Sequence, residues 1–178
     1  MRMCKEKYTF HVSWQPYLLR PNMPPDGIEK PPQYKGVSDH LKAAGQSVGI
    51  DFTGKCPRFP NTIQAHCLLE HAGKVPDGGK TQDKLAEVLF RAYFTDGMYP
   101  SGYNLVELAK EVGMTQEEVE PVITSQENQT AVFNKAGQYM KDGVTGHSMC
   151  LIIKTDLVEV KLKSFRCRHN TPVLYKLH

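Results

Sequence analysis

Asn61, Thr62 and His66 stand together where a helical pattern begins, in the segment PNTIQAH. Asparagine and threonine side chains accept hydrogen bonds from the unpaired N–H groups of a first helical turn, so either residue can cap this helix. The same N–H groups attract anions such as a carboxylate. The segment therefore predicts a helix cap or a first turn that attracts an anion.

The cysteines define a second possible chemistry. The chain has five of them, at irregular spacings: Cys4, Cys56, Cys67, Cys150 and Cys167. No two are separated by two residues, so the sequence contains no Cys-x-x-Cys, the arrangement that lowers a thiol pKa for disulfide exchange. An odd number of cysteines in a chain without an export signal favours reduced thiols over a disulfide framework.

Metal binding is the third chemistry to consider. Cys67 and His71 are four residues apart, so a helix places them on one face, where they could ligate a metal. Cys56 and His66 complete a notional zinc set. Because this spacing matches no standard zinc finger, we expect no metal site.

Composition narrows the class of protein. The chain has 178 residues, which suits one domain with a core, and 23% charged and 40% hydrophobic residues are typical of a globular protein. A net charge of +3 without a basic cluster argues against nucleic-acid binding. No run of about 18 apolar residues is present, so we expect no membrane span. The N-terminus lacks an apolar signal core, which favours a cytoplasmic location.

The first third of the chain mixes a strand with loops. Residues 8–19 alternate apolar and polar side chains, which predicts a half-buried strand. Residues 21–33 contain five prolines and a glycine and predict a loop. A short helix is expected over 34–48, followed by an extended piece at 50–52.

A helical hairpin over 60–94 is the most strongly patterned part of the chain. Its first helix begins at Asn61 or Thr62, and the segment 76–79, with a proline and two glycines, ends it. Thr81 or Asp83 is expected to start the second helix, whose apolar residues recur at helical spacing.

Three further helical segments follow. A helix is expected over 103–112, and Thr115 begins the capping-box sequence Thr-x-x-Glu. Pro121 is expected to separate that helix from a long amphipathic one over 125–141.

The C-terminal part changes character. Strands are expected over 149–153 and 157–162, and the pattern is lost from Phe165 onward. One strand, a long helical stretch and two more strands predict an α/β or α+β sheet with a helical insertion.

Several motifs, in order, resemble those of one known family. They are WQPYLLRPNMPPDG (14–27), PNTIQAH (60–66), LFRAYFTDG (89–97), LAKEVGM (108–114) and GVTG (143–146). Together they resemble DsbA-like thioredoxin-fold proteins of the FrnE type, over about residues 8–146.

The resemblance implies an α/β thioredoxin-like fold interrupted by a helical insertion over about 34–124, with sheet elements at about 8–19 and 149–163. It implies thiol or disulfide substrates, or glutathione, as partners, and no required cofactor. It also places the start of the 60–66 helix near a substrate groove, which makes Asn61, Thr62 and His66 site candidates. Trp14 is the fourth, as either a packed aromatic or a platform for a ligand.

Two departures from the family affect the expected activity. Relatives have a redox motif after their first strand, whereas here Cys4 stands alone and we expect the first strand and redox helix to be missing. Relatives also follow G-V-x-G with a residue and a cis proline, where this chain has His147 and Ser148. We expect a weak or inactive oxidoreductase; a non-catalytic binding module and a glutathione-dependent isomerase remain alternatives, and the catalytic residues and oligomeric state stay open.

The segment 147–178 admits two interpretations. It is either a divergent but genuine terminus that forms a β-hairpin, or the product of a frameshift or alternative splice that displaced the family pattern after Gly146.

Overall fold

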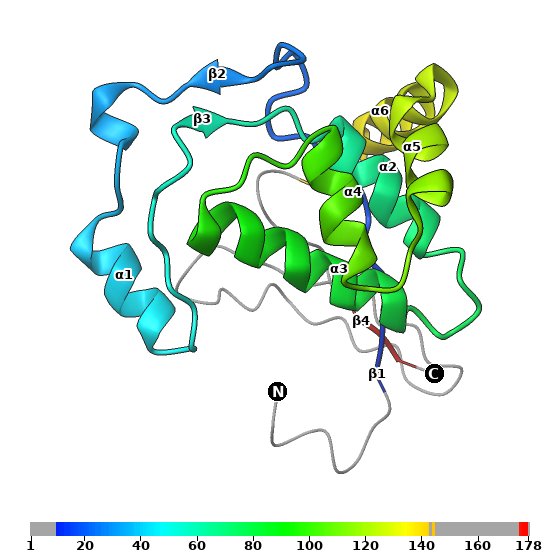
Figure 1. Ribbon diagram of the computed structural model, residues 1–178, viewed down its shortest axis with the longest axis horizontal. Coiled ribbons are helices and arrows are strands. Elements are labelled where there is room, and N and C mark those ends of the chain that lie inside the picture. Colours follow the sequence, from blue (N-terminus) through cyan, green and yellow to red (C-terminus); the bar gives the residue numbers. More distant parts are fainter. Residues whose placement is uncertain (1–9, 143, 145–174, 178) are drawn as a thin grey trace.

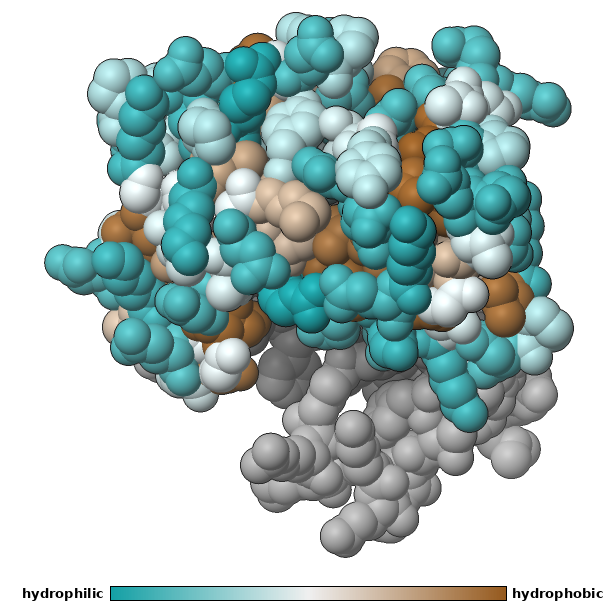
Figure 2. All heavy atoms as spheres, viewed as in Figure 1, coloured by the Kyte–Doolittle hydropathy of each residue, from teal (hydrophilic) through white to brown (hydrophobic). Residues whose placement is uncertain are grey.

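The computed structural model describes residues 10–142, 144 and 175–177. Within this part the fold is a cluster of α-helices with two short two-stranded sheets (Figure 1). An arm formed by β2 (Ile28–Glu29), β3 (Arg58–Phe59) and α1 (Asp39–Gln46) extends from one side of the cluster. Hydrophilic residues cover most of the face seen in Figure 2, and hydrophobic ones show through near its centre.

Helix α2 (Ile63–Ala72) is the centre of the helical cluster. It packs against α3 (Lys80–Phe90), α5 (Gln116–Thr124) and α6 (Gln126–Lys141), and α4 (Tyr103–Lys110) packs on α3 and α5. The shared core is apolar: Ala65, Leu68, Ala72, Leu85, Val88, Leu89, Ala92, Leu105, Val106, Leu108, Ala109, Met114, Val119 and Ile123 are buried in one cluster. The predicted periodicity of these segments is therefore the pattern of their buried faces.

The helical hairpin predicted over 60–94 is present as α2 and α3, but its second helix is capped by a residue that the sequence did not single out. The Asp77 carboxylate accepts hydrogen bonds from the backbone N–H groups of Gly79, Lys80 and Thr81 at 2.9, 3.0 and 2.7 Å, and from the Thr81 hydroxyl at 2.6 Å. These bonds, the Thr81 hydroxyl first, lower the Asp77 pKa below its usual range. α3 therefore begins at Lys80, and Asp77, rather than Thr81 or Asp83, accepts hydrogen bonds from its first N–H groups.

Helix α3 continues into a wider π-helical turn, η3 (Arg91–Asp96), which holds the extended segment before β3. The Phe94 carbonyl accepts from the Thr53 N–H at 3.0 Å, and the Thr95 hydroxyl donates to the Asp51 carbonyl at 2.8 Å. The predicted extended piece at 50–52 therefore bonds to a helix end instead of joining a sheet. Gly97 closes the turn with φ 80°, a left-handed conformation that favours glycine.

The capping box at Thr115 is confirmed, whereas the expected break at Pro121 is wrong. Thr115 and Glu118 exchange side-chain and backbone hydrogen bonds, and α5 runs through Pro121 to Thr124. The break lies at Ser125, whose extended backbone and side-chain hydrogen bond to the Asn128 N–H begin α6. The extended backbone of Ser125 therefore ends α5, whereas Pro121 lies inside that helix.

The N-terminal strand is shorter than predicted. β1 (Phe10–Val12) pairs antiparallel with β4 (Tyr175–Leu177), in a region where no strand was expected, while the rest of 8–19 that the structure describes forms no strand. The strands predicted over 149–153 and 157–162 lie outside the described residues.

After β1 the backbone of Trp14 is bonded by the side chain of Gln82. Its side-chain oxygen accepts from the Trp14 N–H at 2.9 Å, and its side-chain nitrogen donates to the carbonyls of Trp14 and Leu69 at 3.0 Å each. Gln82 is only 3% exposed. The amide therefore bonds both backbone groups of Trp14, as a paired strand would, and links Trp14 to α2 and α3.

We predict that Gln82→Leu lowers the free energy of unfolding by about 2–4 kcal/mol, because it leaves the N–H and carbonyl of Trp14 without the buried amide that bonds them. Urea unfolding followed by circular dichroism measures the change. Lys84→Leu, an exposed position on the same helix, is the matched control and should change stability by less than about 0.5 kcal/mol. Equal effects of the two substitutions would contradict this role for Gln82.

Candidate functional site

The start of α2 is held by Asn61, the first of the candidate site residues. Its side-chain oxygen accepts from the Ile63 N–H at 3.0 Å, and its side-chain nitrogen donates to the Met23 carbonyl at 2.9 Å. Its backbone N–H donates to the Tyr99 hydroxyl at 3.2 Å. Thr62 makes no side-chain cap bond. Of the two predicted caps, Asn61 is the one that forms, and it also joins two loops to the helix.

His66 lies in the next turn of α2. Burial lowers its pKa from the ordinary value of 6.5 to about 4, and a hydrogen bond with the backbone of Tyr17 opposes this shift only in part. The imidazole is therefore uncharged near pH 7, where it can still donate or accept a hydrogen bond.

Trp14 lies away from the start of α2, against α3. Its indole N–H donates to the Asp83 carboxylate at 2.9 Å, and its ring meets Phe90 edge-on with centroids 5.4 Å apart. The segment from Trp14 to Tyr17 thus contacts α3 at its first residue and His66 at its last. The structure brings Asn61, Thr62 and His66 together at the start of α2. Trp14 lies apart from them, bonded to Asp83 of α3.

The two cysteines in the described part of the chain, Cys56 and Cys67, are free and buried. Burial, and next the nearby Glu70 charge, raise the Cys67 pKa to about 11. The Cys56 thiol donates to the Arg58 carbonyl at 3.5 Å. A thiol attacks a disulfide as the thiolate, so Cys67 is inert near neutral pH and Cys56 is enclosed. Cys4, Cys150 and Cys167 lie outside the described residues.

Cys67 and His71 line a hollow of about 120 Å³ between α2, α5 and α6. An ion pair between Glu70 and Lys135, at 2.7 Å, crosses this hollow. In the described residues no group of three or more histidine, cysteine or acidic side chains is gathered as a metal site. The notional zinc ligands of the sequence therefore do not converge there.

A cluster of cations and aromatic rings beside β3 was missed from the sequence. The Arg20 guanidinium lies 4.2 Å from the centre of the Phe59 ring, and the Lys30 ammonium lies 5.6 Å from that centre and 5.2 Å from the centre of the Tyr93 ring. Arg20 and Lys30 occur in a proline-rich loop without periodicity, so no sequence pattern indicated that they share a ring.

We predict that Asn61→Ala lowers the free energy of unfolding by about 0.5–2 kcal/mol, the usual cost of losing a helix cap. Thr62→Ala, one residue along, should leave stability within about 0.5 kcal/mol of the native chain, because its side chain makes no cap bond. Thermal and urea unfolding of both variants provide the test. A larger loss of stability for Thr62→Ala than for Asn61→Ala would show that Thr62, and not Asn61, caps the helix.

His66 should make the fold sensitive to acid. Its folded-state pKa is depressed, so the unfolded chain binds the proton more tightly and stability falls as pH drops from about 6.5 toward 4. The loss attributable to this group is on the order of 3 kcal/mol at most. Urea unfolding of the native chain and of His66→Gln at pH 7.5, 5.5 and 4.5 isolates this contribution. As pH falls, the native chain should lose more free energy of unfolding than the variant does. A difference that does not vary with pH would show that His66 does not titrate this way.

The described helices include none long and apolar enough to cross a membrane. No curated protein and no solved structure matches this chain. Among protein families, the DSBA-like thioredoxin domain matches residues 1–154. That match covers most of the 178 residues and includes all the ordered motifs. The chain belongs to the DSBA-like thioredoxin domain family.

Proposed function

We propose that this chain is a FrnE-type member of its family that binds thiol or disulfide substrates and catalyses disulfide exchange weakly or not at all. The family belongs to the thiol–disulfide oxidoreductase class. The observation that carries the second half of the proposal is the state of the thiols. The Cys67 pKa is raised rather than lowered, and no pair of cysteines in the sequence has the Cys-x-x-Cys spacing.

A binding role is supported by the construction of the α2 start. Asn61 joins the Met23 loop and Tyr99 to the first turn of the helix, so three separate segments meet at one place. Thr62 adds a hydroxyl that makes no cap bond, and His66 adds a neutral imidazole. These groups suit hydrogen bonding to a small polar substrate such as glutathione, and they offer no nucleophile. The two cysteines in the described part of the chain are free thiols. Because reduced thiols persist in the cytoplasm, we place the protein there.

An insulin-reduction assay with dithiothreitol tests the catalytic half. We expect the chain to accelerate insulin precipitation little beyond dithiothreitol alone, with a thioredoxin bearing Cys-x-x-Cys as the positive control. Acceleration that approaches this control would overturn the proposal.

Thiol labelling tests the physical reason. In a variant with Cys4, Cys150 and Cys167 changed to serine, only the two buried thiols remain, and both should react with a disulfide reagent at pH 7 only after the chain unfolds. Fast labelling of the folded variant below pH 7 would show a thiolate that this argument excludes. Glutathione titration followed by NMR tests the binding half: shifts at His66 and Thr62 are expected, and their absence at millimolar glutathione would remove glutathione as the ligand.

A further inference from the structure

Lys30 is an unusual lysine because it is 9% exposed and has no acidic partner in the described part of the chain. Its ammonium faces the rings of Phe59 and Tyr93 at the distances given above. No fully buried side-chain nitrogen or oxygen among the described residues lacks a hydrogen-bond partner. The ammonium, which has none, is therefore not fully enclosed by the protein.

Arg20 shares the Phe59 ring with Lys30. Because both distances are measured to one ring centre, the two cations lie within about 10 Å of each other. At this separation two positive charges repel, and the aromatic face offsets the repulsion only in part. An anion close to both cations would be attracted by both charges.

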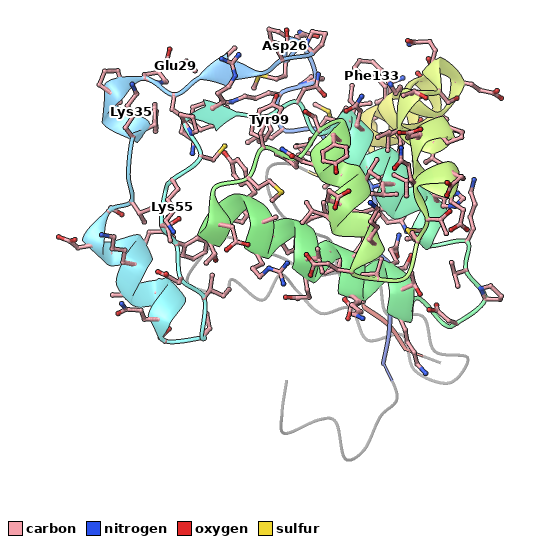
Figure 3. The ribbon with its side chains drawn as sticks, in the orientation of Figure 1. Asp26, Glu29, Lys35, Lys55, Tyr99 and Phe133 are labelled. Carbon is pink, nitrogen blue, oxygen red and sulfur yellow. The ribbon has the colours of Figure 1, made fainter. Side chains whose placement is uncertain are left out.

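The charges around this pair do not cancel it. Arg58 donates to the backbone carbonyls of Asp26 and Gly27 at 3.0 and 3.1 Å and so remains a third positive group. The Glu29 carboxylate is engaged with Lys35 at 3.1 Å. Figure 3 shows Asp26, Glu29 and Lys35 along the outer arm, with Tyr99 between that arm and the helices.

An apolar hollow adjoins the cations. It has a volume of about 360 Å³, is open to solvent, and is lined by Arg20, Pro21, Asn22, Met23, Pro24 and Ile28. Small molecules are usually bound in enclosed pockets, which cover most of their surface. An open hollow beside the short strand β2, which pairs only with β3 within the described residues, suits an extended chain instead.

We propose that this surface binds an extended peptide carrying a carboxylate next to an apolar side chain. The carboxylate is held by Arg20 and Lys30, and the apolar side chain enters the hollow beside Met23 and Ile28. The inference rests on the proposed function, because it specifies the class of ligand that the binding domain takes.

The test uses the full chain and fluorescence anisotropy. The probe is the hexapeptide Gly-Ala-Leu-Asp-Ala-Gly with an uncharged fluorophore at its N-terminus and an amide at its C-terminus, so that the aspartate is its only charge. The matched probe has asparagine in place of aspartate. At about 20 mM salt we expect the aspartate peptide to bind at least about fivefold more tightly, and the difference to shrink as salt is added.

Three variants assign the effect to residues. Lys30→Met and Arg20→Met should each weaken binding of the aspartate peptide about fivefold or more and leave the asparagine peptide unchanged. Lys35→Met, which removes the same charge from the same arm, should stay within about twofold of the native chain. Circular dichroism checks folding; Arg20 is exposed, so Arg20→Met decides the matter if Lys30→Met does not fold.

Each contrary result has its own meaning. Equal binding of the two peptides, no binding of either, or a loss on Lys35→Met equal to that on Arg20→Met would overturn the inference. Displacement of the peptide by hexanoate at or below the peptide's own dissociation constant would make the ligand a small organic acid and overturn the peptide assignment. If insulin reduction is slow and the peptide does not bind, the peptide inference fails and the proposal of weak or absent catalysis stands. If insulin reduction is fast, the proposal of weak or absent catalysis fails and the peptide inference is not affected.

Discussion

The fold depends on one buried amide. Gln82 bonds the N–H and carbonyl of Trp14 and the carbonyl of Leu69, so that three segments distant in sequence meet at a single side chain. An amide suits this place because it offers both a donor and an acceptor without a charge, and burying a charge there would cost far more. The amide also lies against Gly73: a Cβ there would come within 2.8 Å of the Gln82 side-chain nitrogen, so a larger residue would have to displace the amide.

Because α2 receives bonds at both ends, it acts as a frame for the loops. At its C-terminal end the Leu69 carbonyl meets Gln82, and at its start Asn61 bonds the Met23 carbonyl and the Tyr99 hydroxyl. The loops that carry the candidate binding residues are therefore positioned in part by hydrogen bonds to one helix. Such surface segments supported by a rigid element are where binding residues commonly occur.

The local parts of this structure were predictable and the long-range ones were not. The helical hairpin and the Thr115 capping box follow from periodicity and cap chemistry within a few residues, and both are confirmed. Asp77 acts over four residues in a turn where no pattern marks it, and Gln82 looks like any polar helical residue until Trp14 is placed beside it. The shared ring of Arg20 and Lys30 depends on Phe59, whose distance in sequence hides the cluster altogether.

The same construction links ligand binding to stability. Arg20 and Lys30 lie in a segment that is joined to the start of α2 through the Met23 carbonyl and to β3 through the Arg58 side chain and the Phe59 ring. A ligand held by both cations needs this segment folded against β3, because only then do the two side chains share the Phe59 ring. It would therefore bind the folded chain in preference to the unfolded one and stabilise it by mass action. Since Asn61 belongs to the same set of contacts, loss of the cap should loosen the cation pair as well as the helix, so that the two ends of the site behave as one unit.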